Sequence, residues 1–225
     1  MAEVRQQKIA CPQCKRELTI NVWDKVELPY DMQHRDRVLQ NTFFKVGCDG
    51  CQSSFTIAYK CQYNDMERKY LLWVAPAMDE KTQNEINEYN QKLKIDDRLR
   101  LAQGGYHYRI VNSDNELREK VIIFDEGLDD RYIETLKIVY VPLIKNKMGE
   151  GTQITGIYFD RKKAGGYQFI VTFDNKPPMS ANVNMDIYHD MTDKLKSIAE
   201  RNTPEGLCRI DADWGLKVMM HEVEN

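Results

Sequence analysis

The chain has 225 residues, of which 42% are hydrophobic and 30% are charged, and its formal net charge is -3 at pH 7. A chain of this length can bury one ordinary core or two small ones, and its mildly acidic balance argues against a general polyanion binder, which needs a positive field. No apolar run approaches the roughly 20 residues that cross a bilayer, and residues 1–5 lack the apolar stretch of a signal peptide, so we expect a cytoplasmic protein without a membrane partner.

Two cysteine pairs form the most specific motif of the sequence. Cys11 and Cys14 are separated by two residues, and Cys48 and Cys51 repeat this spacing. A tight turn of this length aims both sulfurs of a pair at one point, and two such turns facing each other complete the tetrahedron that zinc prefers. We therefore predict one structural Zn²⁺ per chain, bound by Cys11, Cys14, Cys48 and Cys51.

The first cysteine pair also fits a second chemistry. A C-P-x-C sequence is found in dithiol oxidoreductases, in which the first thiol lies at a helix N-terminus that lowers its pKa. Residues 16–22 instead alternate polar and apolar side chains, which is typical of a half-buried strand. The metal interpretation is therefore favoured, and Lys15 and Arg16 are expected to compensate part of the negative charge of four thiolates.

Both cysteine pairs are predicted at the tips of β-hairpins. The first hairpin spans residues 8–22 and the second spans residues 43–61. In the second hairpin, alternate residues of the strand share one face: Phe55, Ile57, Tyr59 and Cys61. We therefore expect Cys61 to be a small buried residue and not a metal ligand, while Cys208 receives no role.

The segment between the two pairs is longer than the roughly 15 to 20 residues usual in a zinc ribbon, which predicts an insertion. Residues 31–40 fit a short helix, with Asp31 as its candidate N-cap. His34 lies in this helix and could substitute as a ligand. Because four cysteines already fill the tetrahedron, we expect His34 at the surface.

The middle of the chain alternates buried strands with helices. Residues 70–75 form an apolar run that predicts a buried strand, residues 79–97 are polar and predict a solvent-facing connection that is partly helical, and residues 106–111 predict another strand. Ser113 and Glu116 form a capping box that opens a helix. Gly127 should end it, and Asp129 or Asp130 should begin a helix with Ile133, Leu136, Tyr140 and Leu143 on one face.

The last third of the sequence changes to strand periodicity. Residues 154–159 and 167–173 predict a hairpin, residues 179–185 a further strand, and Asp186 the start of a helix. Short closing strands are expected at residues 207–210 and 216–220. We therefore predict an α+β chain of two domains, namely residues 1–145, a zinc ribbon with a helical extension, and residues 146–225, a small antiparallel sheet with a helix.

The motifs resemble the CpXC domain family, a module of bacteria and archaea. The resemblance rests on the two cysteine pairs, with Asp49 where proline is usual, on residues 65–76, and on residues 115–131. Together these cover roughly residues 8–145. The resemblance implies metal binding and no particular reaction.

Three functional classes remain after these observations. The favoured one is a non-enzymatic zinc-binding module that binds another macromolecule, most simply a protein. A zinc hydrolase is disfavoured, because catalytic zinc keeps an open position beside three protein ligands and the four histidines show no H-E-x-x-H grouping. The alternatives are a thiol-disulfide oxidoreductase using Cys11 and Cys14, and a nucleic-acid-binding ribbon with contacts from Arg35, Arg37, Arg161 and Lys162.

Overall fold

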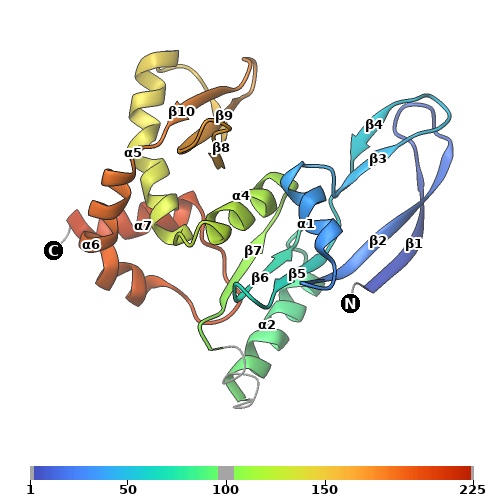
Figure 1. Cartoon of the computed structure of the whole chain (residues 1–225), viewed down its shortest axis with the longest axis horizontal. Helices are drawn as coiled ribbons and strands as arrows, with labels where there is room; N and C mark the ends of the chain where they lie inside the picture. Colours follow the sequence, from blue (N-terminus) through green and yellow to red (C-terminus); the bar gives the residue numbers. More distant parts are fainter. Residues whose placement is uncertain (1–2, 96–103, 224–225) are drawn as a thin grey trace. The chain divides into compact units, whose positions relative to one another are not determined.

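The computed structural model describes residues 3–95 and 104–223, with side chains up to residue 220 (Figure 1). The chain divides into two compact units, Met1–Arg118 with Glu205–Leu207, and Glu119–Pro204 with Cys208–Asn225. This division falls inside helix α4 (Asp114–Asp125), ahead of the domain boundary predicted after residue 145. It lies earlier because helix α5 (Asp130–Met148) packs against helices α6 (Met185–Asn202) and α7 (Ala212–Val223) of the second unit.

A five-stranded mixed sheet organises the first unit (Figure 1). Its strands, in spatial order, are β1 (Glu3–Ala10), β2 (Glu17–Leu28), β5 (Cys61–Asp65), β6 (Tyr70–Val74) and β7 (His107–Val111). Sequence neighbours β1 and β2 pair antiparallel, as do β5 and β6, whereas β2 with β5 and β6 with β7 pair parallel. The prediction of a buried strand is confirmed, because every residue of β6 is buried.

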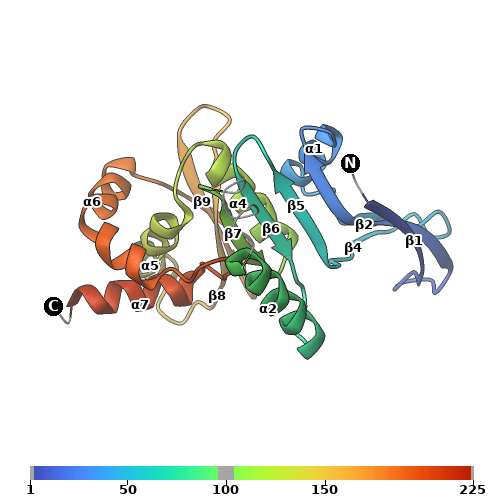
Figure 2. The ribbon, with the colours of Figure 1, turned by 90° about the horizontal axis from the view of Figure 1, so that it is seen from below.

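Helix α2 (Glu80–Ile95) lies beside the sheet (Figure 2). Its Ile86 joins a core with Leu71 and Trp73 of β6. The Asp79 carboxylate accepts the Thr82 N–H at 2.8 Å and so caps the first turn. The expected connection at residues 79–97 is therefore helical over most of its length, and residues 96 and 97 lie outside the described part of the chain.

The hairpin predicted at residues 43–61 is shorter than expected. Strands β3 (Lys45–Gly47) and β4 (Ser54–Thr56) pair antiparallel around the second cysteine pair. The chain then leaves this hairpin, and Cys61 begins β5, which pairs parallel with β2. Cys61 is 2% exposed, which confirms the prediction that it is buried.

The short insertion helix α1 (Met32–Leu39) corrects two expectations. Asp31 does not cap it, because its carboxylate accepts the Glu27 N–H at 2.9 Å instead. His34 is not at the surface but only 2% exposed. Its ring packs against Trp23 and Phe43, with ring centroids 4.1 and 5.7 Å away, so apolar packing places this polar side chain inside.

In the second unit, the start of α5 follows the sequence signals. Gly127 ends α4 with φ of +66°, in the conformation that favours glycine, and the Asp129 carboxylate accepts the Arg131 N–H at 2.9 Å. Within α5, Ile133, Leu136 and Tyr140 are buried, but Leu143 is 58% exposed, contrary to the prediction.

A three-stranded sheet packs on α5, with β10 (Met179–Asn182), β9 (Tyr167–Phe173) and β8 (Ile154–Arg161) in that order. The Phe169 ring meets the Tyr140 ring at 5.0 Å. Asn184, and not Asp186, caps α6. The strand predicted at residues 216–220 is wrong, since these residues lie in α7, and residues 207–210 contain only a single bridge, at Cys208.

A buried group of charged side chains ties the second unit together. Lys120 Nζ lies 2.9 Å from carboxylate oxygens of both Asp130 and Glu134, and Lys137 Nζ lies 2.8 Å from Glu119 Oε1 and 3.0 Å from Glu134 Oε2. Each of these residues is less than a tenth exposed. Such groups persist in a core only when paired and hydrogen-bonded.

No helix within the described residues is both long enough and apolar enough to cross a membrane.

Candidate metal centre

The structure brings the four predicted cysteines together. All four sulfurs lie within 4.8 Å of one another. Cys14 Sγ is 3.6 Å from Cys48 Sγ, and Cys11 Sγ is 3.8 Å from Cys51 Sγ. Both of these contacts join the β1–β2 turn to the β3–β4 turn, so the cluster lies between the two hairpins.

Both cysteine turns have the same backbone hydrogen bonds. In each, the first cysteine donates its N–H to the carbonyl five residues later, and its own carbonyl accepts the N–H of the residue after the second cysteine. That residue has a positive φ, +62° at Lys15 and +58° at Gln52. Residues other than glycine rarely adopt this backbone conformation. The four bonds are Cys11 N to Arg16 O at 2.8 Å, Lys15 N to Cys11 O at 2.9 Å, Cys48 N to Ser53 O at 2.9 Å and Gln52 N to Cys48 O at 2.9 Å.

The four cysteines differ in their access to solvent. Cys11 is fully buried and Cys48 is 3% exposed, whereas Cys51 is half-buried and Cys14 is exposed. The buried pair forms a core with buried Leu18, and three partly buried apolar side chains pack against it: Ile9, Val46 and Phe55. The apolar core between the two hairpins is therefore small.

Two side chains extend from one hairpin to the other at the cluster. Ser53 Oγ lies 3.0 Å from Cys51 Sγ and 3.8 Å from Cys11 Sγ. Arg16 covers Gly50, where a Cβ atom would lie 2.8 Å from Arg16 Cδ. Arg16 and Ser53 occupy the same position in their turns, and the sequence spacing alone did not assign them these contacts.

The thiols influence one another electrostatically. The backbone N–H of Cys14, helped by the Ser53 hydroxyl, lowers the pKa of Cys11 to about 6. The backbone N–H of Arg16 acts to lower the pKa of Cys14, but burial and the other three sulfurs raise it to about 11. The sulfurs alone therefore retain a proton, whereas a cation among them would stabilise all four thiolates. This donor set is compatible with a metal ion.

A family model described as CpXC protein matches residues 9–137. The chain belongs to the CpXC family. The match confirms the resemblance seen in the motifs and includes both cysteine pairs as well as α4 and the first part of α5 of this CpXC protein. No curated protein and no solved structure matches the chain.

Among the described residues of the CpXC chain, the four cysteines are the only group of three or more cysteine, histidine, aspartate or glutamate side chains that could hold a metal. His34 does not join it, since its ring lies among aromatic side chains, and His221 lies beyond the described side chains. Cys61 and Cys208 are buried outside the cluster.

Proposed function

We propose that this CpXC protein is a non-enzymatic module in which one structural Zn²⁺, held by Cys11, Cys14, Cys48 and Cys51, fastens a zinc ribbon that binds a protein partner. The observation that carries the proposal is the convergence of four sulfurs from two turns of the same backbone geometry. Zinc with Zn–S bonds of about 2.3 Å in a tetrahedron needs S–S separations of about 3.8 Å. The sulfur contacts of 3.6 and 3.8 Å fit that requirement.

The donor set supports a structural role. Structural zinc is closed by four protein ligands, whereas catalytic zinc keeps a position for water. When bound, the ion would supply a cross-link between the two hairpins. Their apolar core is small, and metal binding in such sites contributes on the order of 10 kcal/mol, comparable with the stability of a whole domain. The ribbon is therefore expected to depend on its metal.

Metal removal tests this dependence. Treating the purified protein with a strong chelator should lower its melting temperature and expose residues 3–61 to protease, and added Zn²⁺ should restore both. Cleavage mapped to the ribbon, with the second unit still resistant, would locate the effect. Melting and cleavage unchanged by complete metal removal would contradict a structural zinc.

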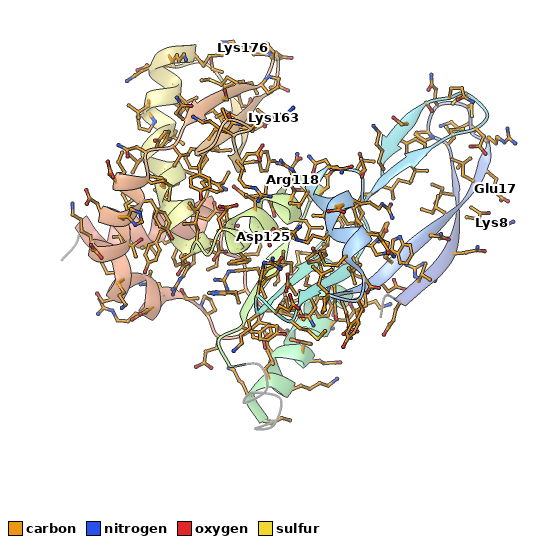
Figure 3. The ribbon with its side chains drawn as sticks, in the orientation of Figure 1. Lys8, Glu17, Arg118, Asp125, Lys163 and Lys176 are labelled. Carbon is orange, nitrogen blue, oxygen red and sulfur yellow. The ribbon has the colours of Figure 1, made fainter. Side chains whose placement is uncertain are left out.

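Strand β1 is the surface that we propose for the partner. It lies at the edge of the sheet, with every residue except Ile9 exposed. Both of its basic side chains are paired within the hairpin: Arg5 lies 2.9 Å from Asp24, and Lys8 lies 2.8 Å from Glu17 (Figure 3). Backbone pairing by an extended peptide, which exposed sheet edges support, therefore fits this strand better than recognition by charge.

A pair of proline variants tests that surface. Cys11 N donates to Arg16 O across the hairpin, and the alternation of antiparallel bonds then directs the N–H of Gln7 toward β2 and that of Gln6 outward. Gln6→Pro should keep zinc and the melting temperature but lose a partner that the wild type captures, whereas Gln7→Pro should destabilise the hairpin. Equal capture by the wild type and Gln6→Pro would exclude the β1 edge.

The two alternative functions, nucleic-acid binding and thiol-disulfide exchange, depend on different residues of the chain. For nucleic acid, the candidate cations already have partners: Arg37 donates to Phe43 O at 3.0 Å, and Arg161 pairs with Glu126 at 2.9 Å. Strong binding that weakens steeply with salt would favour that function. For an oxidoreductase, Cys14 should precede a helix, but β2 follows it; two reactive thiols and no metal in fresh protein would favour that function.

A further inference from the structure

One sulfur of the cysteine cluster is exposed to solvent, and this unequal exposure suggests a modification site. We propose that Cys14 is oxidised by peroxides and that Cys48 resolves the product as a disulfide between the two hairpins, an inference that rests on the proposed metal site. Cys14 is the exposed member of the cluster, Cys51 is half-buried, and Cys11 and Cys48 are buried. A small oxidant therefore meets the Cys14 sulfur first.

The position of Cys48 favours disulfide formation across the hairpins. Its sulfur lies 3.6 Å from Cys14 Sγ, close to the separation of about 3 to 3.5 Å from which reacting atoms combine. Cys48 is held in its turn by the hydrogen bond of its N–H to Ser53 O. The sulfur of Cys51 instead contacts the Ser53 hydroxyl at 3.0 Å and lies 3.8 Å from Cys11 Sγ.

Arg16 adds a positive charge beside the exposed sulfur. A Cβ atom built on Gly50 would lie 3.3 Å from Arg16 Nη1 and 3.7 Å from Cys14 Sγ, so the guanidinium and the thiolate flank the same glycine. A cation near this sulfur attracts the hydroxide that peroxide releases. Gly50 provides the space for it.

The chemistry balances in two steps. The Cys14 thiolate attacks one oxygen of hydrogen peroxide: an S–O bond forms, the O–O bond breaks, hydroxide leaves, and the sulfur loses two electrons to become a sulfenic acid. The Cys48 thiolate then attacks the Cys14 sulfur: an S–S bond forms, the S–O bond breaks, and the second hydroxide leaves. Each hydroxide takes a proton from water or buffer, and a thiol reductant reverses the disulfide.

The expected consequence is metal release under oxidation. A Cys14–Cys48 disulfide removes two of the four thiolates, and the remaining Cys11 and Cys51 do not make a tetrahedral site. Because the new bond joins the same hairpins that the metal joins, the ribbon should stay connected while its metal is lost. Cys61 and Cys208, buried at 2% and 6% exposure, should stay reduced.

Peptide mapping of the zinc-loaded wild-type protein tests the proposal. Trypsin cleaves after Lys8 and Lys15, which gives a peptide with Cys11 and Cys14, and after Lys45 and Lys60, which gives a peptide with Cys48 and Cys51. After hydrogen peroxide and alkylation of the remaining thiols, digestion without reduction should yield these two peptides joined, with fragment ions placing the bond between Cys14 and Cys48. Zinc release should follow the joined product in a one-to-one ratio.

The order of alkylation gives a second readout that needs no variant. In the zinc-loaded protein, where all four sulfurs are thiolates, N-ethylmaleimide should modify Cys14 about ten times faster than Cys11 or Cys48, because Cys14 is exposed and the other two are buried. A third readout uses variants: both Gly50→Ala and Arg16→Gln should slow the reaction of Cys14 with peroxide. A disulfide between Cys11 and Cys14, or oxidation of Cys61 at the same rate as Cys14, would overturn the inference but would not contradict the proposed metal site. Protein that contains no metal before peroxide is added would instead refute the proposed function, and the inference with it.

Discussion

At the residue scale, burial alone does not separate the four cysteines of the cluster from the two that lie outside it. Cys11 and Cys48 are buried like Cys61 and Cys208. The spacing of two residues identifies the four cluster members, because only that spacing gives the turn that aims both sulfurs at one point. The convergence of these four cysteines could therefore be predicted from the sequence, while their role as metal ligands stays a proposal.

Serine variants at one cysteine of each kind should separate ligation from packing. We expect Cys48→Ser to lose bound zinc and to lower the melting temperature of the ribbon, because three thiolates remain and the buried hydroxyl lacks the metal bond. Cys61→Ser should cost about 1 to 2 kcal/mol of stability from burying a hydroxyl but keep the zinc. Metal analysis and thermal melts measure both. Full zinc occupancy in Cys48→Ser would contradict the assignment.

His34 and Asp31 show where residue-level signals fail. No local sequence pattern predicts that Trp23 and Phe43 pack against His34, because these two residues come from β2 and from the segment before β3. Asp31 has the right type for an N-cap, but its carboxylate meets the Glu27 N–H instead. In both cases a contact made by the folded chain overrides the local preference.

At the element scale, the hairpins and most helices follow from periodicity and capping, while strand pairing does not. The parallel pairs β2 with β5 and β6 with β7 bring together residues distant in the sequence, and no local pattern specifies such partners. Helix α7 was mistaken for a strand because its run of apolar residues is short. The missed signal is Asp211, whose carboxylate accepts the Trp214 N–H at 3.1 Å and starts the helix.

Two hydrogen bonds attach the segment around Leu207 to α2, and the neighbouring Gly206 leaves room for them. The Asn90 amide donates to Leu207 O at 3.1 Å and accepts the Leu207 N–H at 2.7 Å. The adjacent Gly206 has φ of +78°, and a Cβ atom there would collide with the Asn90 amide. Leu207 is thereby placed in the core beside Trp73.

We expect Gly206→Ala to lower the free energy of unfolding by about 2 kcal/mol, because it strains the backbone and displaces the Asn90 amide. Combining it with Asn90→Ala should cost less than the sum of the single changes. Gly151→Ala is the matched control, since its Cβ meets no atom within 4 Å. Urea unfolding of the wild type, the two single variants, the double variant and the control measures these effects. Equal free energies of unfolding for Gly206→Ala and Gly151→Ala would refute this role of Gly206.

At the scale of the whole molecule, the chain combines two cysteine-bearing hairpins, which share a small apolar core, with a second unit whose core contains paired charges. Three carboxylates, Glu119, Asp130 and Glu134, face two lysines, Lys120 and Lys137. Burial, reinforced by the neighbouring Glu134 and opposed by Lys137, raises the pKa of Glu119 from 4.5 to about 7. The native state therefore binds this proton more tightly than the unfolded chain.

The sign of the pH effect follows from that raised pKa. The contribution of Glu119 to stability is fully present below about pH 4.5 and is lost as the pH rises through about 7. Loss of the proton from Glu119 should lower the free energy of unfolding by about 3 kcal/mol between these limits. In Glu119→Gln, which keeps an oxygen to accept the Phe159 N–H, this fall should disappear. Identical pH profiles of urea unfolding for wild type and variant would contradict the assignment.

The two-unit organisation was only partly visible in the sequence. The change to strand periodicity after Gly149 is real, but the compact units divide inside α4. The charged residues of the second unit explain the difference, because Glu119 and Lys120 of α4 pair with α5. Charges on a helix normally indicate a solvated face, so sequence patterns gave no reason to place them in a core.

X-ray absorption at the zinc edge of the freshly purified protein tests the central claim most directly. We predict one zinc per chain, bound by four sulfurs at about 2.3 Å with no nitrogen or oxygen neighbour. Protein without zinc, or zinc bound by fewer than four sulfurs, would contradict the account of the cysteine cluster as a closed structural site.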